Sequence, residues 1–219
     1  MSAFWRKRYA CLASVGLTVL LFSCLGIELE TVFHEDGSGT MTMKFVVSKE
    51  LLDMGEEQSG VGIPFTKEDL EDEFGSVEGV TVEEIFQEDT ETDRIITAKL
   101  AFENFNDLSR SNEFPGEEAS LSTNGNLTVF RMLMGQPRGD AGEGAAAEMP
   151  EMAEMDEAMT AMIQSFLEGY TVEYRITAPK KIVKYSHGEL SKDKKTISFF
   201  MSMGDFIMIE EPYFLEVVW

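Results

Sequence analysis

Cysteine and histidine are the scarcest chemically useful residues in this chain of 219 residues. There are two of each, namely Cys11, Cys24, His34 and His187. Cys11 lies in an apolar leader, so a chain cut before Cys24 would carry a single cysteine at its first position. That count excludes a disulfide framework, and it excludes a zinc site built from cysteine and histidine.

Motifs for phosphate binding and for acid–base chemistry are also lacking. The glycines at 37 and 39 belong to a predicted hairpin turn rather than to a strand-to-helix turn, so they do not form a phosphate loop. The acidic runs at 70–73 and 88–93 follow no recognisable motif and are typical of solvated turns and faces. We therefore expect no catalytic residues, no metal and no cofactor, and we expect that the protein is not an enzyme.

Positive charge is scarce, with 18 basic residues against 40 acidic ones and a net charge of −22. Arg6, Lys7 and Arg8 precede the predicted cleavage point and no acidic residue does, so the mature chain carries −25. Such a net charge repels nucleic acid and anionic lipid headgroups. We expect no nucleic-acid partner, and we expect attachment to a membrane to come from an anchor.

One long apolar run is present, and it lies near the start of the chain. The basic residues 1–9 are followed by 13 uncharged residues at 10–22. A transmembrane helix needs about 20 residues, whereas this length is typical of the apolar part of a signal peptide. The end of this run and the two residues after it, Leu21-Phe22-Ser23-Cys24, resemble the lipobox of bacterial lipoproteins, with an aliphatic residue, a small residue and the modified cysteine. Phe22 departs from the usual small residue.

The lipobox predicts cleavage between Ser23 and Cys24 and acylation of Cys24, with residues 1–23 as the signal peptide. Two or three acyl chains, at about 0.8 kcal/mol per buried CH₂, hold a protein stably on a membrane. We therefore expect a lipid-anchored protein of the cell envelope, on a membrane that the sequence does not specify. The alternative is an uncleaved signal anchor with an incidental cysteine.

Alternating apolar residues predict β-strands along most of the mature chain. Three hairpins are expected. The first spans 27–47 across a Gly-containing turn, the second spans 80–102 across an acidic turn, and the third spans 121–134 across Asn124-Gly125. Three further strands are expected at 171–177, 197–201 and 213–219, and short helices at 48–55 and 66–74.

A methionine stripe suggests one long helix. Residues 136–148 predict a flexible Gly/Ala-rich loop, after which Pro150 opens a helix that extends to about Leu167. Met residues recur there at helical spacing, and the stripe continues into apolar residues: Met149, Met152, Met155, Met159, Met162, Ile163, Phe166 and Leu167. Methionine arrays can bind copper, but one unbroken apolar face favours packing. We assign Met152, Met155, Met159, Met162 and Phe166 to a face over a lipid or a partner.

These elements predict an α+β fold in one domain, residues 24–219. A mostly antiparallel, curved sheet of about six to eight strands would carry the long amphipathic helix and one or two short helices.

The mature chain resembles the LppM-type lipoprotein domain family. The resemblance lies in a strand that leads from Cys24 to HEDGSGTMTMKF at 34–45, in the middle pair of helices and strands, and in YRITAPKKIVKYSHGELSKDKKTISFF at 174–200. Family members are expected to show Trp near Phe199 or Phe200, and some have a C-terminal transmembrane helix; this chain has neither feature in its sequence. The resemblance implies a curved antiparallel sheet with helices, and a lipid-binding role without catalytic residues.

Two functions remain open at this point. The first is a non-enzymatic, membrane-anchored module that binds a lipid or a lipid-linked glycan in an apolar pocket. The second is a structural or protein-interaction module of the envelope without a small-molecule ligand. The oligomeric state does not follow from the sequence.

Overall fold

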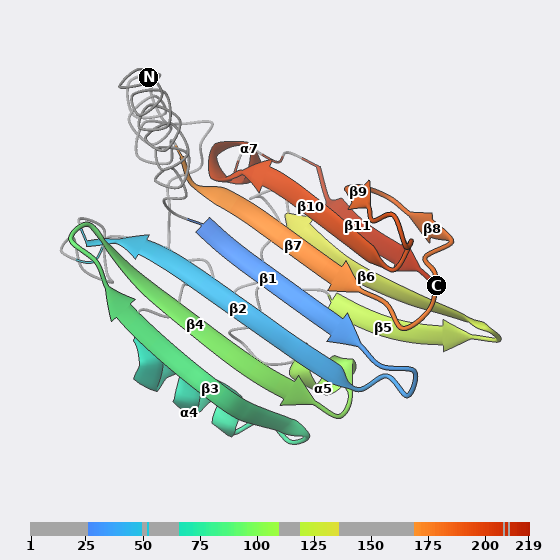
Figure 1. Ribbon diagram of the computed structural model, residues 1–219, viewed down its shortest axis with the longest axis horizontal. Coiled ribbons are helices and arrows are strands. Elements are labelled where there is room, and N and C mark those ends of the chain that lie inside the picture. The colour runs from blue at the N-terminus through green and yellow to red at the C-terminus, as the bar shows by residue number, and fades with distance from the viewer. Residues whose placement is uncertain are drawn as a thin grey trace, which may run out of the picture.

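Two β-sheets form the described part of the chain (Figure 1). The computed structural model describes residues 26–49, 52, 66–109, 119–135, 169–207, 209 and 211–219. Seven strands make the larger sheet, in the order β3 (Val80–Asp89), β4 (Asp93–Phe102), β2 (Gly39–Ser48), β1 (Gly26–Phe33), β7 (Thr171–Thr177), β10 (Thr196–Ser202) and β9 (Glu189–Leu190). Four strands make the smaller sheet, in the order β5 (Ala119–Asn124), β6 (Leu127–Gly135), β11 (Tyr213–Val218) and β8 (Lys184–Tyr185).

Alternation of side chains gives the larger sheet one apolar and one polar face. In β1, Leu29 and Phe33 are buried, whereas Glu28 and Glu30 lie on the other face. Cross-strand ion pairs cover that polar face: Lys44 Nζ lies 2.8 Å from Glu28 Oε1, and Lys99 Nζ lies 2.9 Å from Glu83 Oε2. The period of two along each strand therefore decides which face turns toward the rest of the protein.

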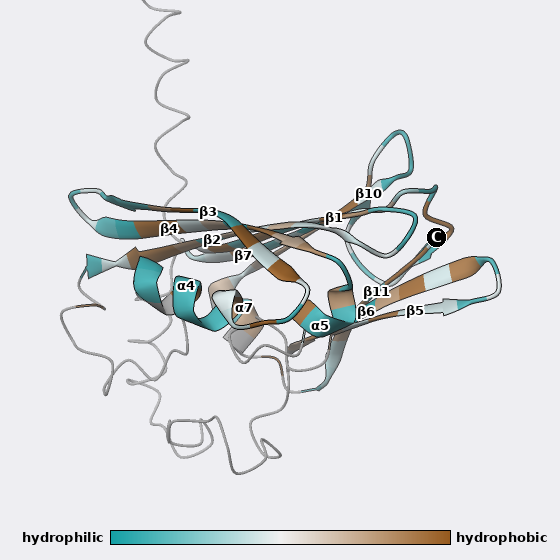
Figure 2. Ribbon diagram, turned by 90° about the horizontal axis from the view of Figure 1, so that it is seen from below, coloured by the Kyte–Doolittle hydropathy of each residue, from teal (hydrophilic) through white to brown (hydrophobic). Residues whose placement is uncertain are grey.

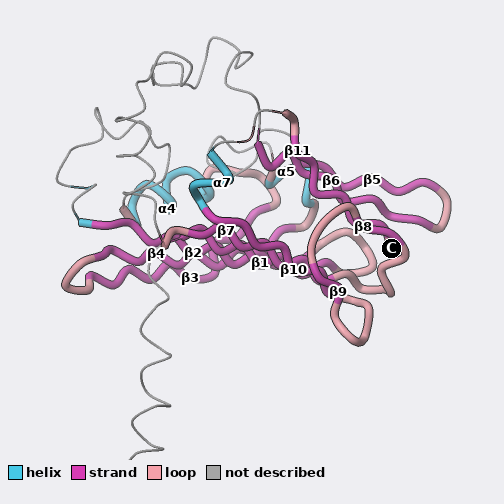
Figure 3. Tube along the Cα trace, turned by 90° about the horizontal axis from the view of Figure 1, so that it is seen from above, coloured by secondary structure: helices cyan, strands magenta, loops and turns pink. Residues whose placement is uncertain are grey.

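The second layer lies against the apolar face. The smaller sheet lies over one end of the larger sheet, and the helices α4 (Lys67–Gly75) and α7 (Met203–Ile207) lie on that same side, below the larger sheet in Figure 2 and above it in Figure 3. A one-turn helix, α5 (Phe105–Leu108), connects the layers, with both of its apolar residues buried. Its amide residue, Asn106, exchanges two hydrogen bonds with the backbone of Leu121, at 2.8 and 2.9 Å.

The predicted hairpins are confirmed. β1 pairs with β2, β3 with β4, and β5 with β6, all antiparallel, and Gly37 and Gly125 have positive φ angles in two of the turns. The three later strands are also present, as β7, β10 and β11. The predicted helix at 66–74 is confirmed as α4.

The predicted fold class is wrong. The described residues are mostly β, with eleven strands in two sheets instead of about six to eight strands in one, so the fold is not α+β. The longest helix of that part, α4, has nine residues. The prediction failed because alternation reveals strands but not which strands pair. The strands at 121–134 and 213–219 were therefore placed in the same sheet as the others, and the layer that covers it was assigned to the helix at 150–167. None of the helices in the described ranges is long and apolar enough to cross a membrane.

Several predictions fall outside the described residues. These are the leader with Ser23 and Cys24, the loop at 136–148, the helix at 150–167 with its methionine face, and most of the helix at 48–55. Ser48 itself is the last residue of β2.

Candidate ligand-binding interior

Methionine side chains line the apolar interior from both sheets. Met41 and Met43 come from β2, and Met132 and Met134 from β6, and each is no more than 3% exposed. Met203, at the start of α7, is also buried. Methionine is unbranched and polarizable, so a surface rich in it adapts to irregular apolar shapes. The interior is thus chemically suited to an apolar guest as well as to a packed core.

One end of this interior is filled by aromatic rings. The Phe33 ring packs against four others, with ring centroids 5.3 to 5.9 Å apart: Phe102, Phe105, Phe130 and Trp219. Two of these pairs are edge-to-face, those with Phe102 and Phe105 at 67°, and the other two are tilted. Rings at such separations favour one another beyond the burial of their area. This end is therefore a packed core that joins the two sheets.

A row of aromatic side chains leads from the interior to the surface. The Tyr174 ring lies 6.4 Å from Phe199, Phe199 lies 5.8 Å from Tyr213, and Tyr213 stacks on His187 at 4.3 Å. These residues come from β7, β10, β11 and the turn before β9. Within the described ranges, the strands of the two sheets are not hydrogen-bonded to each other, so contacts between side chains such as these aromatic rings hold the sheets together.

The ionisation of two tyrosines follows this gradient of burial. Desolvation raises the pKa of the Tyr174 phenol well above its ordinary value, because the side chain is buried in the apolar interior. Desolvation also raises the pKa of Tyr213, which is only half-buried. Both tyrosines therefore stay neutral at physiological pH and act as apolar rings with one polar atom.

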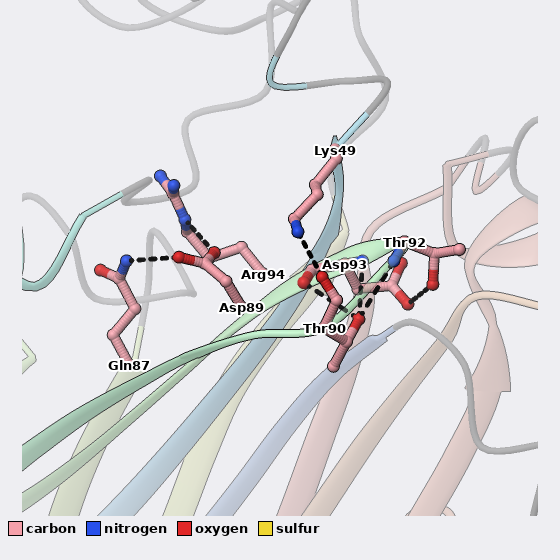
Figure 4. A network of polar contacts seen from close by, with 7 residues as sticks. All are labelled: Lys49, Gln87, Asp89, Thr90, Thr92, Asp93 and Arg94. Carbon is pink, nitrogen blue, oxygen red and sulfur yellow. Dashed lines mark hydrogen bonds and ion pairs between the residues drawn. The ribbon is translucent and has the colours of Figure 1, made fainter.

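A network of polar contacts lies at the turn between β3 and β4 (Figure 4). Arg94 Nε donates to Asp89 Oδ1 at 2.8 Å, the Thr90 hydroxyl oxygen accepts from the backbone N–H of Asp93 at 2.8 Å, and the Lys49 ammonium donates to the Thr90 carbonyl. The hydrogen bond from Arg94 lowers the pKa of the Asp89 carboxyl. These contacts close the turn on itself and join it to Lys49, the residue after β2, so the network stabilises the hairpin and its pairing with β2.

The two histidines take structural positions in separate turns. His34 Nδ1 lies 3.0 Å from the Ser38 hydroxyl in the β1–β2 turn, and His187 stacks on Tyr213. Throughout the ranges that the structure describes, no group of three or more His, Cys, Asp or Glu side chains could hold a metal ion. The Asp36 carboxyl in the same turn as His34 accepts from Ser38, which lowers its pKa.

All of the site residues predicted from the sequence lie outside the described residues. These are Ser23, Cys24, Met152, Met155, Met159, Met162 and Phe166. The structure places Met132, Met134 and Met203 in the buried interior, which the sequence analysis did not anticipate. The signal for Met132 and Met134 was weak, since they flank Leu133 in a run of three apolar residues, which does not reveal which side chains point inward.

Comparisons with known proteins support the fold alone. No protein-family model matches the chain, and no curated protein matches it. The chain is similar in structure to the folded domain of the Mycobacterium tuberculosis LppM protein, solved by NMR, with a TM-score of 0.50 and 11% sequence identity. The match covers 90% of this chain and 89% of that one. The fold is thus loosely LppM-like, and membership of a sequence family is not established.

Proposed function

We propose that this LppM-like chain is a lipoprotein of the cell envelope, anchored through Cys24, whose two-sheet interior binds the apolar part of a lipid or lipid-linked glycan. The anchor rests on the lipobox at Leu21–Cys24 behind a basic, apolar leader. The cell-envelope location rests on that leader together with the LppM-like fold.

The observation that carries the binding role is the methionine content of the interior. Four buried methionines, Met41, Met43, Met132 and Met134, face it from two different sheets. The predicted methionine face of residues 150–167 would add an adaptable surface of the same chemistry. A core that needs only rigid packing is better served by branched aliphatic residues with few rotamers. Methionine on several elements favours an interior that adjusts to a guest.

The second candidate is a structural or protein-interaction module without a small-molecule ligand. The cluster around Phe33 favours it, because that end of the interior is filled by five rings. The two candidates differ in whether the remaining interior holds a guest that is not covalently attached.

Native mass spectrometry of the full chain, purified from membranes in mild detergent, separates the candidates. The proposed function predicts lipid masses that survive removal of detergent, in addition to the covalent acyl groups on Cys24. A chain that carries only the covalent groups, also after incubation with a membrane lipid extract, would support the structural module.

A pair of substitutions at Met155 tests whether the sulfur matters. Met155→Leu keeps apolarity and approximate volume, so lipid binding should be retained, whereas copper binding through thioethers should collapse. Met155→Asp should weaken lipid binding and lower stability, because it places a charge on the predicted apolar face. If Met155→Asp binds lipid as well as the natural chain does, residues 150–167 do not contribute to the site.

A further inference from the structure

Positive charge is concentrated at one corner of this acidic protein. Residues 178–195 contain six lysines and two acidic residues, a net charge of +4 in a mature chain of −25. The lysines are Lys180, Lys181, Lys184, Lys192, Lys194 and Lys195, and all six are exposed. The net charge of the whole chain hides this local excess of positive charge. The repulsion of anionic surfaces that the net charge predicts therefore does not apply at this corner.

The fold builds this basic corner from two segments. The backbone N–H of Ile182 donates to the Lys194 carbonyl at 2.7 Å, and that of Ala178 donates to the Lys195 carbonyl at 2.8 Å. Ile182 and Ala178 are both buried, so they fix the two segments against the core. Lys194 has a φ of 61°, the one residue other than glycine in the described ranges with a positive φ. The lysines are thus held together by the backbone rather than spread along a loose loop.

Few acidic partners neutralise the corner. Among the described residues, Lys184 is the member of the six that forms an ion pair, with Glu216 at 2.9 Å. Lys195 donates to the Pro179 carbonyl at 3.0 Å, a contact that leaves its charge in place. Most of the positive charge therefore faces solvent and is open to an external anion.

Apolar side chains stand between the lysines. Val183 is 66% exposed and Tyr185 is 41% exposed, on either side of Lys184. They are two of the five large hydrophobic residues that the described part of the chain exposes. Lysine and tyrosine around an exposed aliphatic tip is the chemistry of the membrane–water interface, where ammonium groups meet phosphates and the tip enters the acyl boundary. An acidic protein surface would attract the lysines but would leave the Val183 side chain exposed to water.

We propose that this basic corner docks on an anionic phospholipid surface, with Val183 and Tyr185 at headgroup depth. The proposal rests on the proposed function for one point only, that a membrane anchor brings the domain close to such a surface. The corner then acts as a second contact beside the acyl chains, and the two contacts together set the orientation of the domain.

The strand register fixes that orientation. Gly26, two residues after Cys24, pairs with Thr171 at the start of β7, whereas the basic corner follows Thr177 at its end. Six residues of strand at about 3.3 Å each separate these points by about 20 Å. Figure 1 shows β9 beside β10, level with the C-terminal half of β7, and β8 near the C-terminus. Both contacts can be made at once only if β1 and β7 lie along the membrane rather than upright.

Lysine labelling of the full chain on vesicles tests the proposal. The chain is mixed with vesicles of phosphatidylcholine alone, or with added phosphatidylglycerol, and acetylated briefly with an amine-reactive ester. We expect Lys180, Lys181, Lys192 and Lys194 to react on the order of fivefold more slowly on the anionic vesicles. This factor corresponds to the free energy with which an anionic membrane surface attracts one lysine. In 1 M salt the difference should vanish, because charges are then screened within about 3 Å. Equal labelling on both vesicle types would overturn the proposal.

Two matched variants locate the effect. Lys180→Glu/Lys181→Glu should abolish the protection of Lys192 and Lys194, whereas Lys67→Glu/Lys99→Glu makes the same change in net charge outside the corner and should preserve it. Lys67 and Lys99 pair with Glu71 and Glu83 on α4 and β3. If both variants lose the protection, the protection depends on the net charge of the chain and not on this corner, and the proposal is overturned. Protection without vesicles that grows with protein concentration would assign the corner to an acidic protein surface instead.

The same samples distinguish a failure of this proposal from a failure of the predicted lipid anchor. Flotation with the neutral vesicles reports the anchor, and the difference in labelling between vesicle types reports the corner. A chain that fails to float with neutral vesicles, yet is protected on anionic ones, would contradict the anchor and support the corner.

Discussion

Phe33 and Trp219 pack against each other with ring centroids 5.3 Å apart, although Phe33 ends the first strand of the larger sheet and Trp219 is the last residue of the sequence. Trp219 is held in place by two backbone hydrogen bonds with Thr128, at 2.8 and 3.0 Å. The contact therefore joins the larger sheet to β6 and β11 of the smaller one. Stability of the two-sheet arrangement should depend strongly on this ring cluster.

Phe33→Ala should destabilise the protein by about 3–5 kcal/mol, since it removes a buried ring and leaves a cavity among four others. Phe200→Ala is the matched control, because Phe200 is 66% exposed on β10 and should cost no more than about 0.5 kcal/mol. Denaturant unfolding followed by circular dichroism gives both values. Similar midpoints for the two variants would show that the cluster is not the core described above.

Gly39→Ala should destabilise by about 1–3 kcal/mol, because a Cβ at this position would lie 2.1 Å from the Val32 carbonyl oxygen and 2.6 Å from the Phe102 ring. Gly75→Ala, at the end of α4, meets nothing within 4 Å and should be neutral or slightly stabilising. The comparison uses the same unfolding experiment. A neutral Gly39→Ala would argue against the close approach of β1 and β2 at this turn.

Asp89 should titrate below its ordinary pKa of 3.8, because Arg94 donates a hydrogen bond to its charged form. A carboxyl whose pKa is lowered by folding stabilises the fold above the unfolded pKa, and that contribution is lost as the pH falls through the folded value. Carbon-detected NMR of the side-chain carboxyl measures the pKa directly. In Arg94→Gln the pKa should rise toward 3.8; an unchanged value would mean that the ion pair of Figure 4 does not form in solution.

Cys24→Ala should abolish incorporation of an alkyne fatty acid, because the thiol that accepts the diacylglyceryl group is gone. The precursor should then accumulate uncut or be released from the membrane. Cys11→Ala is the control, since Cys11 lies in the predicted leader and its loss should leave labelling intact. Unchanged labelling of Cys24→Ala would contradict the anchor.

Local patterns in the sequence were enough to predict each hairpin. In β1 and β2 the alternation of apolar residues and the Asp36–Gly39 turn specify strand type, inward face and register, because all three depend on residues close together in the chain. The same holds for Asn124-Gly125 between β5 and β6.

The pairing of distant strands was decided only by tertiary structure. β7 lies parallel to β1 although more than 130 residues separate Phe33 from Thr171, and no local pattern encodes such a contact. For the same reason β6 and β11 were not assigned to a second sheet, and the methionines of β6 were not seen to share an interior with those of β2.

The basic corner was also decided by tertiary structure. The sequence contains its lysines, but hydrogen bonds from Ala178 and Ile182 to 194–195 bring them to one place, because burial of the apolar side chains draws the two segments onto the same core.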